Sequence, residues 1–192
     1  TSSGVVTTLA GLAGDSGSAD GAGSGARFLI PSGVAVDGAG NAYVADSGNH
    51  TIRKVTSSGM VSTLAGLAGN PGSADGTGSE ARFNDPQGLA VDGTGNVYVA
   101  DHDNDTIRKV TASGVVTTLA GLAGATGNAD GTGSAAQFFF PSSVAVDGSG
   151  NVYVVDYCTA IRKVTAAGVV TTLVNGGCPG GPAGGETGGP GG

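Results

Sequence analysis

A repeat of about 55 residues limits what this chain can fold into. The segment GVVTTLAGLAG at residues 4–14 returns in close to the same form at residues 59–69, 114–124 and 168–177, in steps of 55, 55 and 54 residues. A repeat of this length forms one supersecondary unit, and neighbouring units bury a shared core by stacking. The sequence therefore predicts a modular fold of three full units.

Each unit contains four short β-type runs separated by turn residues. In the first unit these runs cover residues 34–37, 42–45, 51–56 and 60–65. Gly40-Asn41 suits a tight hairpin that needs positive φ. Runs such as VAV and YVVD are apolar on both faces, so their sheets must be covered on both sides. Four-stranded sheets stacked around an axis meet that need, which predicts the blades of a β-propeller.

The stretch PSGVAVDGAGNAYVADSGNHTIRKVT at residues 31–56 resembles the NHL repeat, whose pattern runs P-x-G-V-A-V-D, G-N-x-Y-V-A-D, N and I-R-K-V. Residues 86–111 keep every landmark, whereas residues 141–165 lack the loop Asn and one further residue. The resemblance covers nearly all of residues 4–174. It implies a β-propeller, usually of six blades, that acts mostly as a binding platform and occasionally as an enzyme.

The predicted fold is all-β, with three four-stranded blades and an extra N-terminal strand. We expect this orphan strand within residues 1–11, NHL-like repeats at 12–66, 67–121 and 122–174, and a Gly/Pro-rich tail at 175–192. Such a half-ring exposes blade faces and strand edges, which is a hazard unless another chain covers them. Three interpretations stay open: a closed six-bladed dimer, a fibre, or a fragment of a longer propeller.

Self-assembly or scaffolding is the function that this half-ring favours, with further copies of the chain as its partner. The residues expected to mediate assembly lie in the leading strand and the tail: Val5, Val6, Thr7, Thr8, Leu9, Ala10, Pro179, Pro182 and Pro190. One alternative is a platform that binds a glycan or a protein. A remote alternative is a metal-dependent propeller lyase or hydrolase.

Composition and charge exclude two classes of partner. Lys and Arg number 8 against 15 Asp and Glu, for a net charge of −7. With no basic field to neutralise phosphates, nucleic-acid binding is excluded. The uncharged run at residues 110–129 is interrupted by Gly, Ser, Thr and Asn and recurs as part of the repeat. We therefore expect no membrane span there.

Two features predict covalent modification and a secreted or cell-surface location. The sequons at Asn49 and Asn104 are candidates for N-glycosylation, although NHL-like loops carry this Asn in any case. Cys158 and Cys178 should lie on one face of the last blade. A disulfide between them would close a loop of about 20 residues and add about 3 kcal/mol of stability; two free thiols are the alternative. A disulfide would indicate an oxidising compartment.

Candidate metal and catalytic residues are few. Asp101, Asp103 and Asp105 have the spacing of a calcium loop but lack its turn glycine and its bidentate Glu. His50 and His102 occupy non-equivalent repeat positions and supply no ring of ligands around an axis. We therefore expect no catalytic residues, no cofactor and no firm metal site.

The remaining charged and aromatic landmarks predict framework contacts. The Arg residues of the three Arg-Lys pairs should pair with the Asp residues of adjacent strands: Arg53 with Asp46, Arg108 with Asp101 and Arg162 with Asp156. Phe28, Phe83 and Phe138 should anchor the long connection on the core. Phe139 and Phe140 break the repeat and suit a surface that faces a partner.

Overall fold

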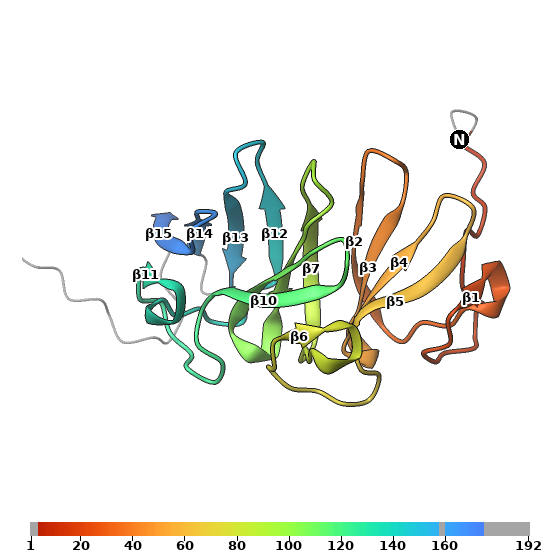
Figure 1. The fold of residues 1–192 in the computed structure, drawn as a ribbon, viewed down its shortest axis with the longest axis horizontal. Helices are drawn as coiled ribbons and strands as arrows, with labels where there is room; N and C mark the ends of the chain where they lie inside the picture. The colour runs from red at the N-terminus through yellow and green to blue at the C-terminus, as the bar shows by residue number, and fades with distance from the viewer. Residues whose placement is uncertain (1–3, 158–159, 175–192) are drawn as a thin grey trace, which may run out of the picture.

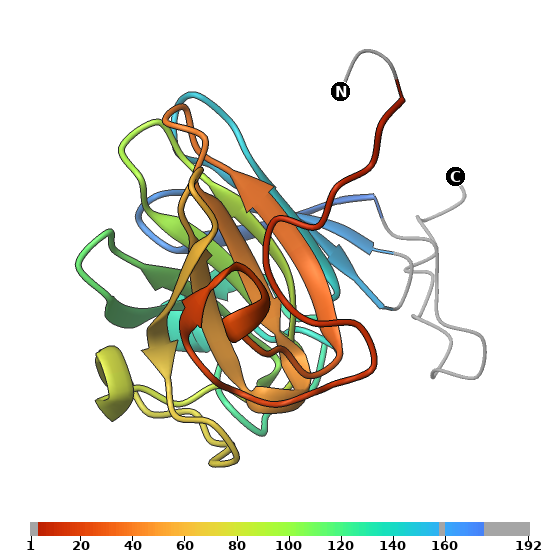
Figure 2. The ribbon, with the colours of Figure 1, turned by 90° about the vertical axis from the view of Figure 1, so that its right-hand side faces the viewer.

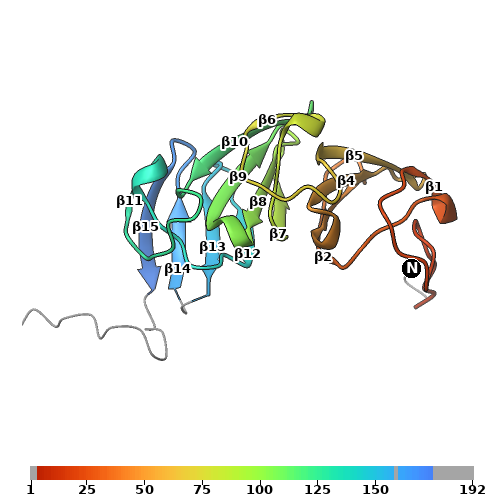
Figure 3. The same cartoon turned by 90° about the horizontal axis from the view of Figure 1, so that it is seen from below.

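Three five-stranded antiparallel sheets, one for each repeat, make up the protein. The structure is a computed structural model that describes residues 4–157 and 160–174. We call the sheets blades 1, 2 and 3; Figures 1 and 3 show them side by side in an arc. Among the described residues, no helix is long and apolar enough to cross a membrane.

The blades share one pattern of strands. Blade 1 contains β1 (Gly21–Ala22), β2 (Pro31–Val36), β3 (Ala42–Asp46), β4 (Thr51–Val55) and β5 (Met60–Gly66). Blade 2 contains β6 (Gly76–Thr77), β7 (Pro86–Val91), β8 (Val97–Asp101), β9 (Thr106–Val110) and β10 (Val115–Ala120). Blade 3 contains β11 (Gly131–Thr132), β12 (Ser143–Val146), β13 (Val152–Asp156), β14 (Ala160–Val164) and β15 (Val169–Val174).

Short 3-10 helices complete each unit. One type follows the first strand of each blade: η1 (Gly23–Gly25), η3 (Gly78–Glu80) and η5 (Gly133–Ala135). The other type joins the third and fourth strands of blades 1 and 2: η2 (Ser47–Asn49) and η4 (His102–Asn104). Each ends on a residue with left-handed backbone, His50 and Asp105.

The four strands predicted for each unit are confirmed, and in blade 1 they are β2 to β5. The order of the whole sheet is β1-β5-β4-β3-β2. The hairpin at Gly40 is also confirmed, with φ of 81°. Each sheet has a fifth strand that the sequence did not predict. β1 pairs with β5 through only two residues, Gly21 with Val61 and Ala22 with Met60. A two-residue strand is too short to produce a recognisable alternation of side chains.

The extra N-terminal strand is a correction. Residues 4–9 form no strand, because they join none of the ladders of the described sheets. Figure 2 shows this segment running alongside blade 1. Cys158, Cys178 and the tail prolines Pro179, Pro182 and Pro190 lie outside the described residues. The disulfide and the role of the tail therefore stay predictions.

The core lies between the blades, as the doubly apolar strands predict. Tyr43 and Ile52 of blade 1 pack with Phe83 and Val99 of blade 2 in one cluster. An equivalent cluster joins blade 2 to blade 3. The inner strands β2, β7 and β12 lie on the concave side of the arc in Figure 3. Stacking buries both faces of the middle blade and leaves one face of each outer blade open.

Candidate functional site

A buried arginine holds each blade together. In blade 2, the guanidinium of Arg108 donates to Asp101 Oδ2 at 2.7 Å and to Asp75 Oδ1 at 2.8 Å. It also lies 5.2 Å from the centre of the Phe83 ring. Arg53 and Arg162 repeat these contacts in blades 1 and 3. The predicted Arg–Asp pairs and the anchoring role of the Phe residues are confirmed.

The asparagines of the two sequons belong to the same network. The side-chain amide of Asn104 donates to Asp101 Oδ2 at 2.8 Å and to the carbonyl of Gly72 at 2.7 Å. Asn49 makes the equivalent bonds to Asp46 and Gly17. Both asparagines are buried. A glycan on either nitrogen would replace one of its two hydrogens and so remove at least one of these bonds. The structure thus gives both asparagines a structural role, and their glycosylation stays a prediction.

Burial also perturbs the carboxyl groups of this network. It raises the pKa of Asp101 to about 6, although the charge of Arg108 opposes the shift. Burial raises the pKa of Asp156 in the same direction. Both carboxylates are occupied by backbone and side-chain donors of the framework. Their shifted pKa values therefore reflect structure and do not mark an acid–base site.

The three carboxylates of the weak calcium candidate, Asp101, Asp103 and Asp105, do not point to a common centre. Asp101 faces Arg108, while Asp103 accepts a bond from His102 Nδ1 at 2.8 Å. Asp105 points to blade 3, where it accepts from the backbone N–H of Phe140. The three carboxylates diverge because η4 turns the chain between them.

A different group of side chains gathers where the blades vary. Structurally equivalent positions carry Ile30, Asp85 and Phe140, and a second set carries Ser47, His102 and Tyr157. Across blades 2 and 3 these positions and their neighbours form what we call the variable cluster: Asp85, His102, Asp103, Phe139, Phe140 and Tyr157. Framework residues repeat from blade to blade, whereas these loop positions differ, and binding residues are often carried on loops that a rigid scaffold positions.

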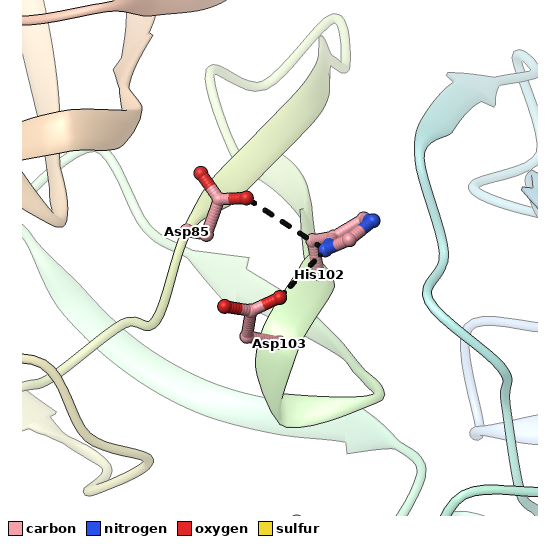
Figure 4. Close-up of side chains that lie close together, drawn as sticks. All are labelled: Asp85, His102 and Asp103. Carbon is pink, nitrogen blue, oxygen red and sulfur yellow. Dashed lines mark hydrogen bonds and ion pairs between the residues drawn. The ribbon is translucent and has the colours of Figure 1, made fainter.

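The variable cluster is continuous. The His102 ring stacks on Phe140 at 5.1 Å between ring centroids, and Phe140 meets Phe139 edge-on at 5.0 Å. Tyr157 lies 6.1 Å from Phe139 and is 69% exposed. At the other end, Figure 4 shows Asp85 and Asp103 turned toward His102 Nδ1, at 3.7 and 2.8 Å. The result is an aromatic row that ends in two carboxylates.

Backbone geometry fixes the row. Ile30, Asp85 and Phe140 all have left-handed backbone, with φ of 49°, 50° and 48°. This conformation is unusual for residues with a β-carbon. The N–H of Asp85 donates to His50 Nδ1 at 3.1 Å, and that of Phe140 donates to Asp105 Oδ1 at 2.8 Å. A residue of the preceding blade thus binds the backbone of Asp85 and of Phe140.

Within the described residues, Asp85, His102 and Asp103 form the one group of three potential metal ligands that lie close together. Asp85 also accepts a bond from the Gln87 amide at 3.1 Å. Exposed acidic groups are common in proteins without a metal, and this group supplies one imidazole against the three histidines of many catalytic zinc sites. The carboxylates of Asp85 and Asp103 are suited to accept hydrogen bonds from a ligand.

Comparison with known proteins identifies the repeat. The family model for the NHL repeat matches residues 28–55, and the teneurin NHL domain model matches residues 68–130. The chain thus contains NHL-type repeats. NHL repeat-containing protein 2 of Bos taurus is 40% identical over 97 residues, which are 50% of this NHL chain and 13% of that protein. Human NHL repeat-containing protein 3 is 32% identical over 110 residues, 56% of the chain and 28% of the relative. The chain therefore spans only a small part of these relatives.

Solved structures confirm the propeller fold. An auxiliary nutrient binding protein from Bacteroides ovatus superposes with a TM-score of 0.56 and 27% identity, over 70% of this NHL chain and 35% of that protein. A second such protein, from Bacteroides thetaiotaomicron, gives a TM-score of 0.61 at 22% identity, over 72% and 36% of the two chains. The NHL chain is thus a propeller-type domain of the kind used for binding or scaffolding.

Sequence reasoning missed two parts of this site. Asp85 directly precedes β7 and belongs to no recognisable sequence motif. Its position next to His102 depends on the packing of β7 against η4, which the sequence does not reveal. Asp75, which binds Arg108 and the Thr118 N–H, was seen only as a repeated landmark. The signal that could have found the variable cluster was available, because aligned repeats show Ile, Asp and Phe at one position.

Proposed function

We propose that this NHL-repeat chain is a non-catalytic binding module and that its ligand lies on the variable cluster. The aromatic row that crosses the junction between blades 2 and 3 carries the proposal. Tyr157 offers an exposed ring at one end, and Asp85 and Asp103 offer acceptors at the other. A ring face next to hydrogen-bond acceptors is the usual chemistry of a specific ligand site.

A saccharide is the ligand class that this chemistry fits best. Its hydroxyl groups would donate to the two carboxylates, and its C–H faces would pack on the Phe140 and Tyr157 rings. The net charge of −7 disfavours anionic ligands. The likeness to a Bacteroides ovatus structure described as an auxiliary nutrient binding protein, at 27% identity, supports a binding role.

The non-catalytic part of the proposal rests on the family and on the residues of the cluster. Two neighbours, a virginiamycin B lyase at 17% identity and a gluconolactonase at 12%, share the fold alone. The remote alternative, a metal-dependent lyase or hydrolase, has a direct test. Metal analysis that finds a stoichiometric ion, lost in His102→Ala, would favour an enzyme.

Glycan-array screening followed by titration calorimetry tests the proposal. Phe140→Ala and Tyr157→Ala should each weaken a saccharide hit at least about tenfold, the loss expected of an aromatic residue at the centre of a binding site. Ile30→Ala is the matched control, because Ile30 has the same backbone conformation in blade 1. Equal affinity in all three variants would reject the site. Binding of peptides without binding of glycans would reject the saccharide.

Self-assembly and a secreted or cell-surface location are the finer functions predicted from the sequence. Both stay hypotheses with separate tests. Light scattering of the intact chain measures its native mass and so tests assembly. Mass spectrometry of the non-reduced chain tests the Cys158–Cys178 disulfide, on which the predicted oxidising location depends.

A further inference from the structure

Two carboxylates of the variable cluster have no counterpart in blade 1. Asp85 stands where blades 1 and 3 carry Ile30 and Phe140, and Asp103 stands where blade 1 carries Gly48. The two side chains are 36% and 44% exposed. Blade 1 forms without either acid, so neither carboxylate belongs to the shared framework.

The negative charge of this pair is not balanced by the protein. A framework carboxylate such as Asp101 bonds to a buried arginine. Among the described residues, no lysine or arginine nitrogen lies within 4.0 Å of Asp85 or Asp103, and His102 is the one basic side chain that reaches them. In the same part of the chain, Asp85 Oδ1 and Asp103 Oδ2 accept no hydrogen bond. The pair thus combines free acceptors with uncompensated negative charge.

His102 adds a further acceptor. Its Nδ1 lies 2.8 Å from Asp103 Oδ1, and an ionised carboxylate can only accept, so we assign the ring proton to Nδ1. In the neutral ring Nε2 is then an acceptor. Figure 4 shows this second nitrogen turned away from both carboxylates, and no described residue donates to it. The blade 2 end of the variable cluster therefore presents acceptors on both sides of the imidazole ring.

An ammonium group matches these carboxylates better than a hydroxyl group does. An ammonium carries three donors, no acceptor and a positive charge, whereas a hydroxyl brings one donor and two lone pairs. An oxygen of Asp85 and one of Asp103 lie within 4.8 Å of each other, close enough for one nitrogen to bond both at about 2.8 Å. Charge-assisted bonds of this kind are stronger than neutral ones. The net charge of −7 also attracts cations.

We propose that the variable cluster selects an amino sugar, whose ammonium group bonds Asp85 and Asp103 while the rest of the oligosaccharide packs along the aromatic row. This inference rests on the proposed saccharide site and names its ligand class. The Phe140 ring stacks on His102 at 5.1 Å, so an aromatic ring lies directly beside the acceptors. His102 Nε2 accepts a hydroxyl of the same ligand.

Three tetrasaccharides with one β-1,4 backbone test the inference, because they differ only in the group at C2. The glucosamine tetramer carries an amine there, the N-acetylglucosamine tetramer a neutral amide and the glucose tetramer a hydroxyl. Titration calorimetry at pH 7 and low salt measures the affinity of each. We expect the glucosamine tetramer to bind at least about tenfold more tightly than the other two. This preference should shrink at high salt, which screens exposed charges.

Two isosteric variants locate the selectivity. Asp85→Asn and Asp103→Asn each remove one charge, and asparagine tolerates the left-handed backbone at position 85. Each should weaken the glucosamine tetramer at least about tenfold and leave the affinity for the glucose tetramer nearly unchanged. Glu80→Gln is the matched control, because Glu80 is exposed in the same blade and lies outside the variable cluster. It should change none of the three affinities beyond a small effect of net charge.

The possible failures are distinguishable. Equal affinity for the three tetrasaccharides would overturn this inference and leave the proposed saccharide site standing. Binding of none of them would overturn both. A tetralysine peptide offers the same ammonium groups without a sugar ring, and tighter binding of this peptide would assign the carboxylates to a protein ligand. Binding that requires added Ca²⁺ would assign them to a metal ion, and either result would overturn the inference.

Discussion

Asp105 of blade 2 accepts a hydrogen bond from the backbone N–H of Phe140 in blade 3, at 2.8 Å. Its second oxygen accepts from the hydroxyl of Thr126, also at 2.8 Å, and the carboxylate is buried. At the preceding junction His50 Nδ1 takes the same role toward Asp85. Two different side chains thus provide one acceptor, and this acceptor sets where the variable residue of the next blade lies.

Replacement of Asp105 should loosen the junction between blades 2 and 3. Asp105→Ala leaves the Phe140 N–H and the Thr126 hydroxyl without this acceptor, at a cost of about 1–3 kcal/mol. Asp105→His restores the acceptor that blade 1 uses and should recover part of the loss. Urea denaturation measures both variants. An equal loss of unfolding free energy in both variants would show that the hydrogen-bond acceptor at position 105 does not stabilise the junction.

The buried arginine should dominate the stability of a blade. Arg108→Met removes the partner of the buried Asp101 carboxylate and should lower the free energy of unfolding by about 3–5 kcal/mol. The adjacent Lys109 is partly exposed beside the Tyr98 ring. Lys109→Met is the matched control and should cost about 0.5 kcal/mol or less. Chemical denaturation measures both variants. Similar losses of unfolding free energy would contradict the stabilising role of the Arg108 network.

Substitutions at Asn104 and Thr106 both remove the second sequon but should affect stability differently. Asn104→Asp removes both amide hydrogen bonds and brings a second acid next to Asp101, so we expect a loss of about 2 kcal/mol or more. The hydroxyl of Thr106 is buried and has no hydrogen-bond partner among the described residues. Thr106→Val also removes the sequon, yet it should be neutral or stabilising. Thermal unfolding of the two variants gives the comparison, and a destabilised Thr106→Val would contradict it.

Acid should weaken the hairpin turns. Partial burial raises the pKa of Asp92, but hydrogen bonds from Asn96 and Thr94 outweigh this effect and lower it to about 2. The folded state therefore favours the carboxylate, and this stabilisation is present above pH of about 4 and is lost as the pH falls toward 2. The advantage of the wild type over Asp92→Asn in unfolding free energy should be larger at pH 7 than at pH 2.5. A difference in unfolding free energy that is the same at both pH values would contradict the lowered pKa of Asp92.

Much of the fold was predictable because the same landmark residues occur in three successive repeats. The strands, the hairpin glycine and the pairing of Arg108 with Asp101 all follow from residues that recur in phase. The fifth strand of each blade was not predictable. Gly21–Ala22 has no alternation of its own, and it pairs with β5 only because the long connection folds back.

The site was less predictable, since its residues are the ones that do not repeat. Asp101, Asp103 and Asp105 have calcium-loop spacing, but spacing does not reveal which way η4 directs each carboxylate. The sequon at Asn104 likewise gives no sign that its amide is held by Asp101. Phe139 and Phe140 were recognisable as exceptions, whereas their contact with His102 depends on the stacking of two blades.

The shared left-handed backbone at Ile30, Asp85 and Phe140 has a consequence for the history of such proteins. An aliphatic, an acidic and an aromatic residue adopt the same φ at this position, so the turn keeps its shape whichever side chain it carries. A single codon change can then exchange an aliphatic group for an acid or an aromatic ring without rebuilding the turn. Each duplicated blade therefore adds a loop position whose side chain can change. Ligand specificity can diverge at this position while the fold of the blades stays the same.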